Sequence, residues 1–154
     1  MNYEALWDEA HQEGLIVKEK PLKYNNGRIK GKRIAIRKDI ETSVEKACVL
    51  AEELGHYHTT VGDITDLSDS RNRKQERQAR MWGYNKLIGL TGIIQAFRAG
   101  CHSRHETAEY LDVTEEFLKE CIDCYRDKYG ICTTVDNYTV FFIPNLAVMV
   151  MEEV

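Results

Sequence analysis

The segment from Thr42 to His58 constrains the fold of this chain more than any other. Thr42 and Glu45 have the spacing of a capping box, in which a hydroxyl and a carboxylate cap the first turn of a helix. Apolar residues then recur three and four positions apart: Val44, Ala47, Cys48, Ala51 and Leu54. The pattern predicts an amphipathic helix from Thr42 to about His56 or His58, whose apolar face must pack against the rest of the protein.

The polar face of this helix gathers two acids and a histidine. At 100° per residue, Glu52 lies about 40° from His56 and Glu53 lies about 60° from it. Metal sites of the H-E-x-x-H type need two ligands one turn apart and a glutamate beside them as general base. Here the first position is Glu52. We predict metal ligands at Glu52 and His56 and a catalytic base at Glu53, although the same residues are also typical of a solvated helix face.

A third ligand is expected from the next helix, which follows a polar stretch and is predicted from about Asn72 to Ile88. Glu76, Ala79 and Gly83 form one stripe on this helix. The two small residues would let it approach the first helix closely. The predicted ligand set is therefore Glu52, His56 and Glu76, with a fourth position left for water, as catalytic zinc sites require.

The other patterns predict an α+β chain that is mostly helical. An Asn26-Gly27 turn and the alternation at Ile34 and Ile36 favour a small antiparallel sheet. Capping boxes and apolar spacing predict short helices, two of which form a helix-turn-helix-like pair that starts at Ser103 and Thr114. We expect one domain over residues 1–154, with a core at 1–100, the helix-turn-helix-like segment at 101–130 and a terminal hairpin or strand at 131–154.

Composition excludes several classes of protein. The chain has 154 residues, of which 43% are hydrophobic and 30% charged, so a disordered protein is excluded. No apolar run approaches the roughly 18 residues that cross a bilayer. Five cysteines on mostly helical, apolar patterns favour reduced thiols over a disulfide framework. These features predict a cytoplasmic protein.

The charges are unevenly distributed along the chain. Residues 18–38 hold nine Lys and Arg against the single acid Glu19, although the net charge is −4. This basic segment is either a solvated hairpin whose lysines protect sheet edges or a surface for an acidic peptide or nucleic acid. Direct nucleic-acid binding by the helix-turn-helix-like pair is not expected, because Glu115 and Glu116 crowd the end of the second helix that would meet phosphates.

Three sequence blocks, taken together with the basic sheet before them, resemble a known family. They are L-A-E-E-L-G-H at residues 50–56, E-R-Q-A-R-M-W at 76–82, and E-T-A-E-Y-L-D-V-T-E-E-F-L at 106–118. In this order they look like the phage and mobile-element branch of the ImmA/IrrE metallopeptidases, also called domain of unknown function 955. The resemblance covers residues 3–130, and its specificity comes from the combination of blocks.

The resemblance implies a zincin-like fold and a zinc-dependent endopeptidase. Its substrate would be a helix-turn-helix repressor encoded beside it, so the protein would act as an antirepressor for a prophage or mobile element. By position, His56 matches the second histidine ligand, Glu53 the catalytic glutamate and Glu76 the downstream acidic ligand. Two alternatives are a catalytically inactive zincin-like protein that binds its repressor stoichiometrically and a helix-turn-helix DNA-binding protein.

Glu52 stands where the family's usual motif has a histidine. Two carboxylates and one neutral imidazole cancel the charge of a divalent ion, whereas two imidazoles and one carboxylate leave a net charge of +1. The Glu-His-Glu set therefore favours harder divalent metals more than the usual set does. We expect zinc at this site, with another divalent metal as the alternative.

Overall fold

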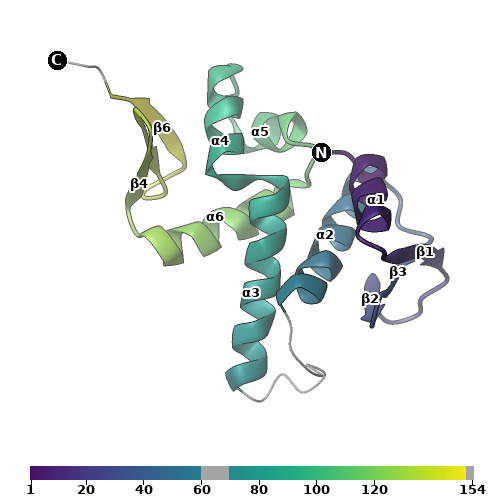
Figure 1. The fold of residues 1–154 in the computed structure, drawn as a ribbon. Helices are drawn as coiled ribbons and strands as arrows, with labels where there is room; N and C mark the ends of the chain where they lie inside the picture. The colour runs from purple at the N-terminus through teal and green to yellow at the C-terminus, as the bar shows by residue number, and fades with distance from the viewer. Residues whose placement is uncertain (60–69, 152–154) are drawn as a thin grey trace. The chain divides into compact units, whose positions relative to one another are not determined.

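The computed structural model describes residues 1–59 and 70–151, with the side chains of residues 70–72 left aside. The polar stretch that connects the two predicted site helices falls at residues 60–69, outside the described part. The chain divides into two compact units, Met1–Lys86 and Leu87–Val154, which we describe separately (Figure 1). Within the described residues both units combine helices with a small three-stranded sheet, so the predicted α+β class is confirmed.

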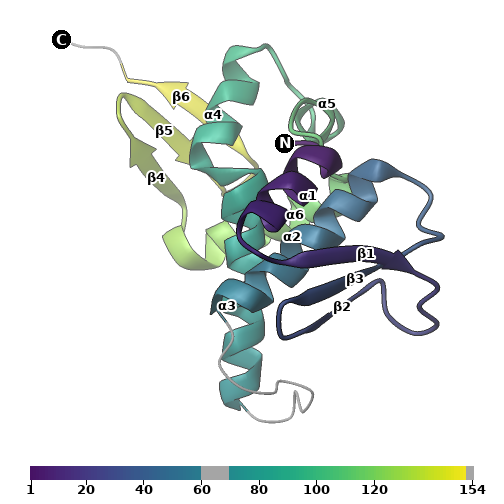
Figure 2. The same cartoon turned by 45° about the vertical axis from the view of Figure 1, so that its right-hand side comes forward.

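The N-terminal unit contains α1 (Tyr3–Gln12), a sheet, and the helices α2 (Ser43–Thr59) and α3 (Ser70–Leu87). The sheet has the order β1-β3-β2, with β1 at Ile16–Lys20, β2 at Gly27–Lys30 and β3 at Arg33–Arg37 (Figure 2). Strands β2 and β3 pair antiparallel, as predicted, whereas β1 lies parallel to β3. The sheet is therefore mixed.

The hairpin turn lies five residues later than the Asn26-Gly27 turn that the sequence predicts. Gly27 begins β2, and the two-residue turn falls at Gly31 and Lys32, where Gly31 has a φ of +60°. A two-residue hairpin of the II′ kind places glycine at its first turn position because that position requires positive φ. Two glycines with turn-forming neighbours were available, and the local pattern pointed to the wrong one.

The alternation of side chains along this sheet separates an apolar face from a basic one. Val17, Ile34 and Ile36 are buried, and strands β2 and β3 lie against α2. By the register, the opposite face carries six basic side chains from all three strands: Lys18, Lys20, Arg28, Lys30, Arg33 and Arg37. The uneven charge of the sequence thus becomes a basic sheet face.

Helix α2 forms as its capping signal predicts and extends one residue beyond the predicted end. The backbone N–H of Glu45 donates to the Thr42 hydroxyl over 3.1 Å. On the apolar face Ala47, Leu50 and Ala51 have no exposed surface at all. Burial of this stripe fixes the helix against the unit and leaves its other face for polar residues.

Small residues bring α3 into backbone contact with α2. A Cβ built on Gly55 would lie 2.1 Å from the carbonyl oxygen of Ala79, and one built on Gly83 would lie 3.3 Å from the carbonyl oxygen of Ala51. The predicted close approach through Ala79 and Gly83 is confirmed. Gly55 on α2 supplies the tightest point of contact, which the sequence analysis did not single out.

The C-terminal unit contains α4 (Gly89–Arg98), α5 (Arg104–Tyr110), α6 (Glu115–Tyr129) and a second sheet. Ser103 and Thr114 cap α5 and α6, accepting hydrogen bonds over 3.0 Å from backbone N–H groups three residues later. The sheet is antiparallel, with the order β4-β5-β6 (Cys132–Val135, Tyr138–Phe141 and Ala147–Val150). The predicted helix pair and terminal hairpin both form, and β6 extends the hairpin.

The core of this unit gathers apolar residues from α6 and the chain around β5. Leu118, Cys121, Tyr125 and Val140 are fully buried, and Phe142 is almost so. Burial raises the pKa of the Cys121 thiol well above its usual range, so Cys121 behaves as a packed apolar group. None of the five cysteines, all of which lie in the described residues, forms a disulfide. In the described parts of both units, no helix is both long and apolar enough to cross a membrane.

Candidate metal centre

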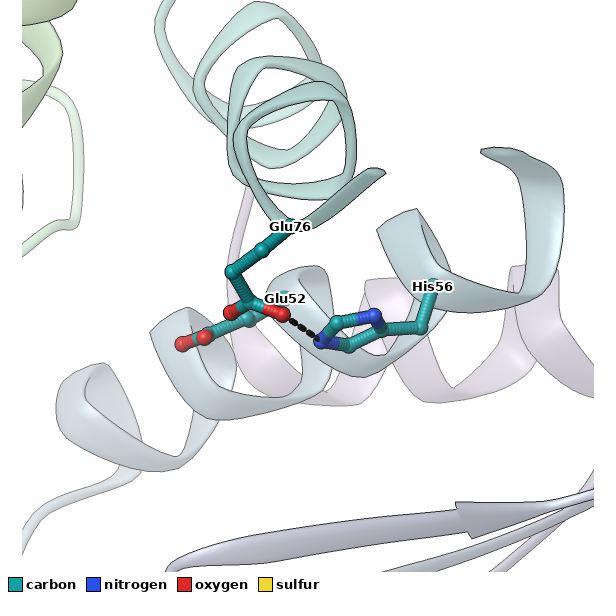
Figure 3. A group of neighbouring side chains, drawn as sticks. All are labelled: Glu52, His56 and Glu76. Atoms are coloured by element: carbon teal, nitrogen blue, oxygen red, sulfur yellow. Dashed lines mark ion pairs between the residues drawn. The ribbon is translucent and has the colours of Figure 1, made fainter. Parts of the chain in front are cut away.

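Three of the predicted site residues converge between α2 and α3. Glu52 and His56 lie one turn apart on α2, and Glu76 extends toward them from α3 (Figure 3). One ligand atom from each residue lies within 4.8 Å of the others. The structure thus brings together the predicted set, two carboxylates and one imidazole, in a half-buried position.

The separation of His56 and Glu76 suits a bound divalent ion. His56 Nε2 lies 3.3 Å from Glu76 Oε2. Ligands of a tetrahedral zinc ion lie about 3.4 Å apart, because each is about 2.1 Å from the metal. Both side chains are largely buried, with 11% of the His56 side chain and 18% of the Glu76 side chain exposed. The donor set therefore fits a zinc-sized ion.

The electrostatics of His56 favour the form that can bind a metal. Burial lowers the pKa of His56 and nearby Arg80 lowers it further, while the carboxylate of Glu76 opposes them by raising it. The net effect is a lowered pKa, so the imidazole is neutral at neutral pH. A neutral imidazole offers a nitrogen lone pair to a metal ion.

Glu53 is a strongly perturbed carboxyl group beside these ligands. Burial, followed by the charges of Glu52 and Glu76, raises its pKa to about 8. Its side chain lies close against the start of β2, since a Cβ built on Gly27 would lie 2.9 Å from Glu53 Oε1. A carboxyl group with a raised pKa close to two candidate ligands has the properties of a general acid and base.

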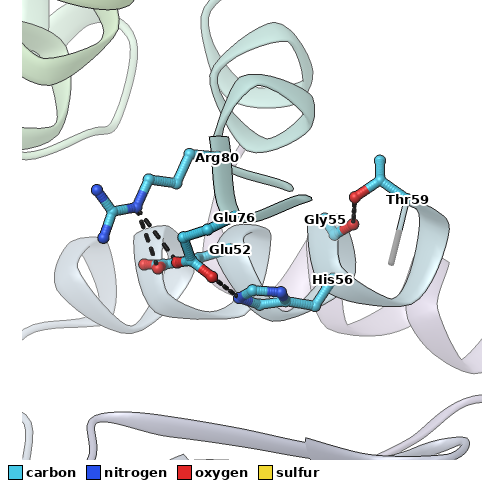
Figure 4. Close-up of polar contacts among 6 residues, drawn as sticks. All are labelled: Glu52, Gly55, His56, Thr59, Glu76 and Arg80. Carbon is cyan, nitrogen blue, oxygen red and sulfur yellow. Dashed lines mark hydrogen bonds and ion pairs between the residues drawn. The ribbon is translucent and has the colours of Figure 1, made fainter. Parts of the chain in front are cut away.

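Arg80 is a member of the site that the sequence analysis did not identify. Its Nε lies 3.4 Å from Glu76 Oε1 and 3.7 Å from Glu52 Oε1, so one guanidinium faces both carboxylates (Figure 4). Glu76 and Arg80 are four positions apart on α3, a spacing at which opposite charges meet on a helix surface. That spacing is the signal that could have revealed Arg80.

The end of α2 decides the role of His58. The helix continues to Thr59, whose hydroxyl donates to the Gly55 carbonyl over 2.7 Å (Figure 4). His58 therefore stays on a different side of the helix from His56. It stacks on Trp82 with 4.6 Å between ring centroids and pairs with Glu13 at 2.9 Å. A continuous helix predicts that His58 faces the core. Its ring packs on Trp82, but the residue is exposed, with 30% of its side chain accessible, so that prediction is wrong.

A cleft of about 830 Å³ lies elsewhere, within the C-terminal unit, and none of the predicted site residues lines it. Its walls include residues of α4, α6 and β6, among them Phe97, Lys119, Arg126 and Val148. The candidate metal centre is identified by the convergence of its donor atoms.

Comparison with protein families places this geometry in a known context. A peptidase family model, described as the IrrE N-terminal-like domain, matches residues 10–122. The chain belongs to this family. The match includes α2 and α3 with all four predicted site residues, and the family is one of metallopeptidases, which implies a bound metal. No curated protein and no solved structure matches the chain.

Proposed function

We propose that this member of the IrrE N-terminal-like family is a zinc-dependent endopeptidase that acts in the cytoplasm. Its substrate is a helix-turn-helix repressor of a prophage or mobile element, and cleavage relieves repression. The observation that carries the proposal is the convergence of Glu52, His56 and Glu76 beside Glu53, in a chain that matches a metallopeptidase family.

The residues of the site divide the chemistry of peptide hydrolysis between them. Glu52, His56 and Glu76 would hold the ion. Zinc, when bound, lowers the pKa of a water molecule and polarises a carbonyl group. Glu53 accepts a proton from the attacking water and returns it to the leaving amine, a role suited to a carboxyl group whose pKa lies near the working pH. Burial of His56 keeps its imidazole neutral and its nitrogen available.

Cleavage of the repressor by the Glu53→Gln variant tests the proposal. The substrate is the helix-turn-helix repressor encoded next to this protein in its source genome. The amide cannot carry the proton, so we expect cleavage to fall by at least about 100-fold while zinc binding persists. Intact-mass analysis of the repressor and metal quantification of the peptidase provide the two readouts. Undiminished cleavage would refute the assignment of Glu53.

A second candidate function is a non-catalytic antirepressor that binds its repressor stoichiometrically. The departure of Glu52 from the usual histidine favours it, because a metal centre of lower net charge is a weaker activator of water. The amount of protein needed and the effect of a chelator distinguish an enzyme from a stoichiometric binder. An enzyme releases repression at far less than equimolar amounts and stops when a chelator is added, whereas a stoichiometric binder needs equimolar amounts and ignores the chelator.

A further inference from the structure

The two carboxylate oxygens of Glu76 face different partners, His56 and Arg80. Glu76 Oε2 faces His56 Nε2 at 3.3 Å, whereas Glu76 Oε1 faces the Arg80 Nε at 3.4 Å. One oxygen therefore points to the position of the ion and the other to the guanidinium (Figure 4). Residues that bind the free oxygen of a ligating carboxylate orient the ligand and tune the metal.

The same guanidinium approaches Glu52, the residue that departs from the family's usual histidine. The distance from the Arg80 Nε to Glu52 Oε1 is 3.7 Å. Arg80 thus contacts both carboxylates of the predicted ligand set, one from α2 and one from α3. Arginine suits this role because its planar guanidinium stays charged and can face several carboxylate oxygens.

The net charge of the metal centre links Arg80 to Glu52. A divalent ion with two histidines and one glutamate, the arrangement of many catalytic zinc sites, has a net charge of +1. Glutamate at position 52 reduces this to zero, because Glu52 and Glu76 each contribute −1. The positive charge of Arg80 beside both carboxylates returns the total to +1.

We infer that Arg80 compensates for the presence of glutamate at position 52: it positions the two carboxylate ligands and restores the net charge of a two-histidine, one-glutamate metal centre. The inference rests on the proposed function only in that Glu52, His56 and Glu76 bind the ion. Arg80 is a positioning residue, since it acts through the two ligands. Its effect is moderated by solvent, because 51% of its side chain is exposed.

A double-mutant cycle on zinc affinity tests this inference. The four proteins are native, Arg80→Gln, Glu52→His and the double variant, and competition with a chromophoric chelator at fixed pH and salt gives each dissociation constant. In the Glu52→His background Arg80 makes the centre too positive, so Arg80→Gln should tighten zinc binding. In the native background Arg80→Gln also removes the group that holds both carboxylates. We therefore expect the change that Arg80→Gln makes in the zinc dissociation constant to differ by about fivefold or more between the two backgrounds.

Two further variants test whether the effect of Arg80 on zinc affinity comes from its charge, from the shape of the guanidinium, or from any positive charge on α3. Arg80→Lys keeps the charge and should retain most of the native affinity. Lys74→Gln removes an exposed positive charge from the same helix α3 and should change zinc affinity equally in both backgrounds. If Glu52→His fails to fold, as circular dichroism would show, Glu52→Gln replaces it in the cycle, because it also removes the negative charge.

The outcomes distinguish this inference from the proposed function. An equal effect of Arg80→Gln in both backgrounds overturns the role of Arg80 and leaves the metal centre intact. The absence of zinc binding in all four proteins overturns the metal centre itself. A fivefold difference with rescue by Arg80→Lys supports compensation.

Discussion

Helices α2 and α6 each carry two adjacent glutamates, yet their surroundings differ completely. Glu52 and Glu53 lie in the middle of α2, where burial and neighbouring carboxylates raise the pKa of Glu53 to about 8. Glu115 and Glu116 lie exposed in the first turn of α6, next to its cap at Thr114. There they face the positive end of the helix dipole and stabilise the helix.

The difference shows that the residue pair is not itself the signal for a site. The two helices have similar capping, and both present acids on a polar face. On α2, a second helix approaches through small residues, at Gly55 and Ala79. That approach brings Glu76 and Arg80 onto the polar face and turns solvated acids into a candidate metal centre.

The most damaging test of this contrast is Gly55→Ala. Its Cβ would lie 2.1 Å from the Ala79 carbonyl oxygen, and a backbone atom cannot rotate away. We expect a loss of at least roughly 4 kcal/mol in unfolding free energy, together with loss of metal binding. Urea unfolding measures the loss. Gly92→Ala is the matched control, because its Cβ would meet only the end of the Leu111 side chain at 3.2 Å. A stable Gly55→Ala protein would contradict the backbone contact.

Glu53→Gln should flatten the pH dependence of stability in the metal-free protein. The folded-state pKa of Glu53 is about 8 against an ordinary value of 4.5, so the folded protein keeps a proton that the unfolded chain releases. Native stability should therefore fall as the pH rises from about 5 to about 8, by on the order of 3 kcal/mol. Urea unfolding in the presence of a chelator measures this slope. An equal slope in the variant would assign the effect to other groups.

Removal of a predicted ligand from α2 should strongly weaken metal binding, whereas removal of a glutamate from α6 should leave metal binding unchanged. We expect Glu52→Ala and His56→Ala each to weaken zinc binding by roughly 100-fold or more, since each removes one of three protein ligands. Glu115→Ala and Glu116→Ala serve as controls with the same charge change as Glu52→Ala. Metal quantification after dialysis against a weak chelator gives the comparison, and equal retention in all four variants would place the ion elsewhere.

Gly27→Ala should disturb the Glu53 carboxyl group without removing it. The added Cβ would lie 2.7 Å from a Val49 methyl group and 2.9 Å from Glu53 Oε1, so Glu53 must shift. We expect a cost of about 1–2 kcal/mol in stability and a larger fractional loss of peptidase activity than of zinc binding. Parallel losses in the two readouts would indicate a general packing defect.

Glu116→Gln on α6 should have the smallest effect, and its sign should be opposite to that of Glu53→Gln. Loss of a favourable charge in the first turn costs about 0.5 kcal/mol, whereas Glu53→Gln stabilises the metal-free protein at pH 8. Urea unfolding of the two variants at pH 8 compares them directly. If both variants changed the unfolding free energy in the same direction, the proposed difference between the glutamates of α2 and α6 would be wrong.

Local signals in the sequence were sufficient for the helices and for the convergence of three site residues. The Thr42 and Ser103 caps formed as predicted, because capping depends on residues within one turn. The spacing of Glu52 and His56 and the small residues of α3 were enough to predict which residues meet. The metal-binding and catalytic roles of these residues remain predictions.

Long-range pairing could not be predicted in the same way. The parallel arrangement of β1 and β3 depends on the path of the chain between strands, and the true turn at Gly31 competed with an equally plausible glycine. The contact of Arg80 with Glu52 and the close approach of Gly27 to Glu53 could not be predicted, because each joins residues on different elements. Such contacts are visible only when the tertiary structure is known.

At Gly55 the backbones of α2 and α3, which carry the predicted ligands, meet with no side chain between them. Because main chain meets main chain there, repacking of neighbouring apolar side chains cannot widen or narrow the gap in which an ion would sit. Any retuning of the centre for another cation must then come from exchanging the donor groups or the charge beside them. Positions 52 and 80 suit such an exchange, because the side chains of Glu52 and Arg80 are both partly exposed.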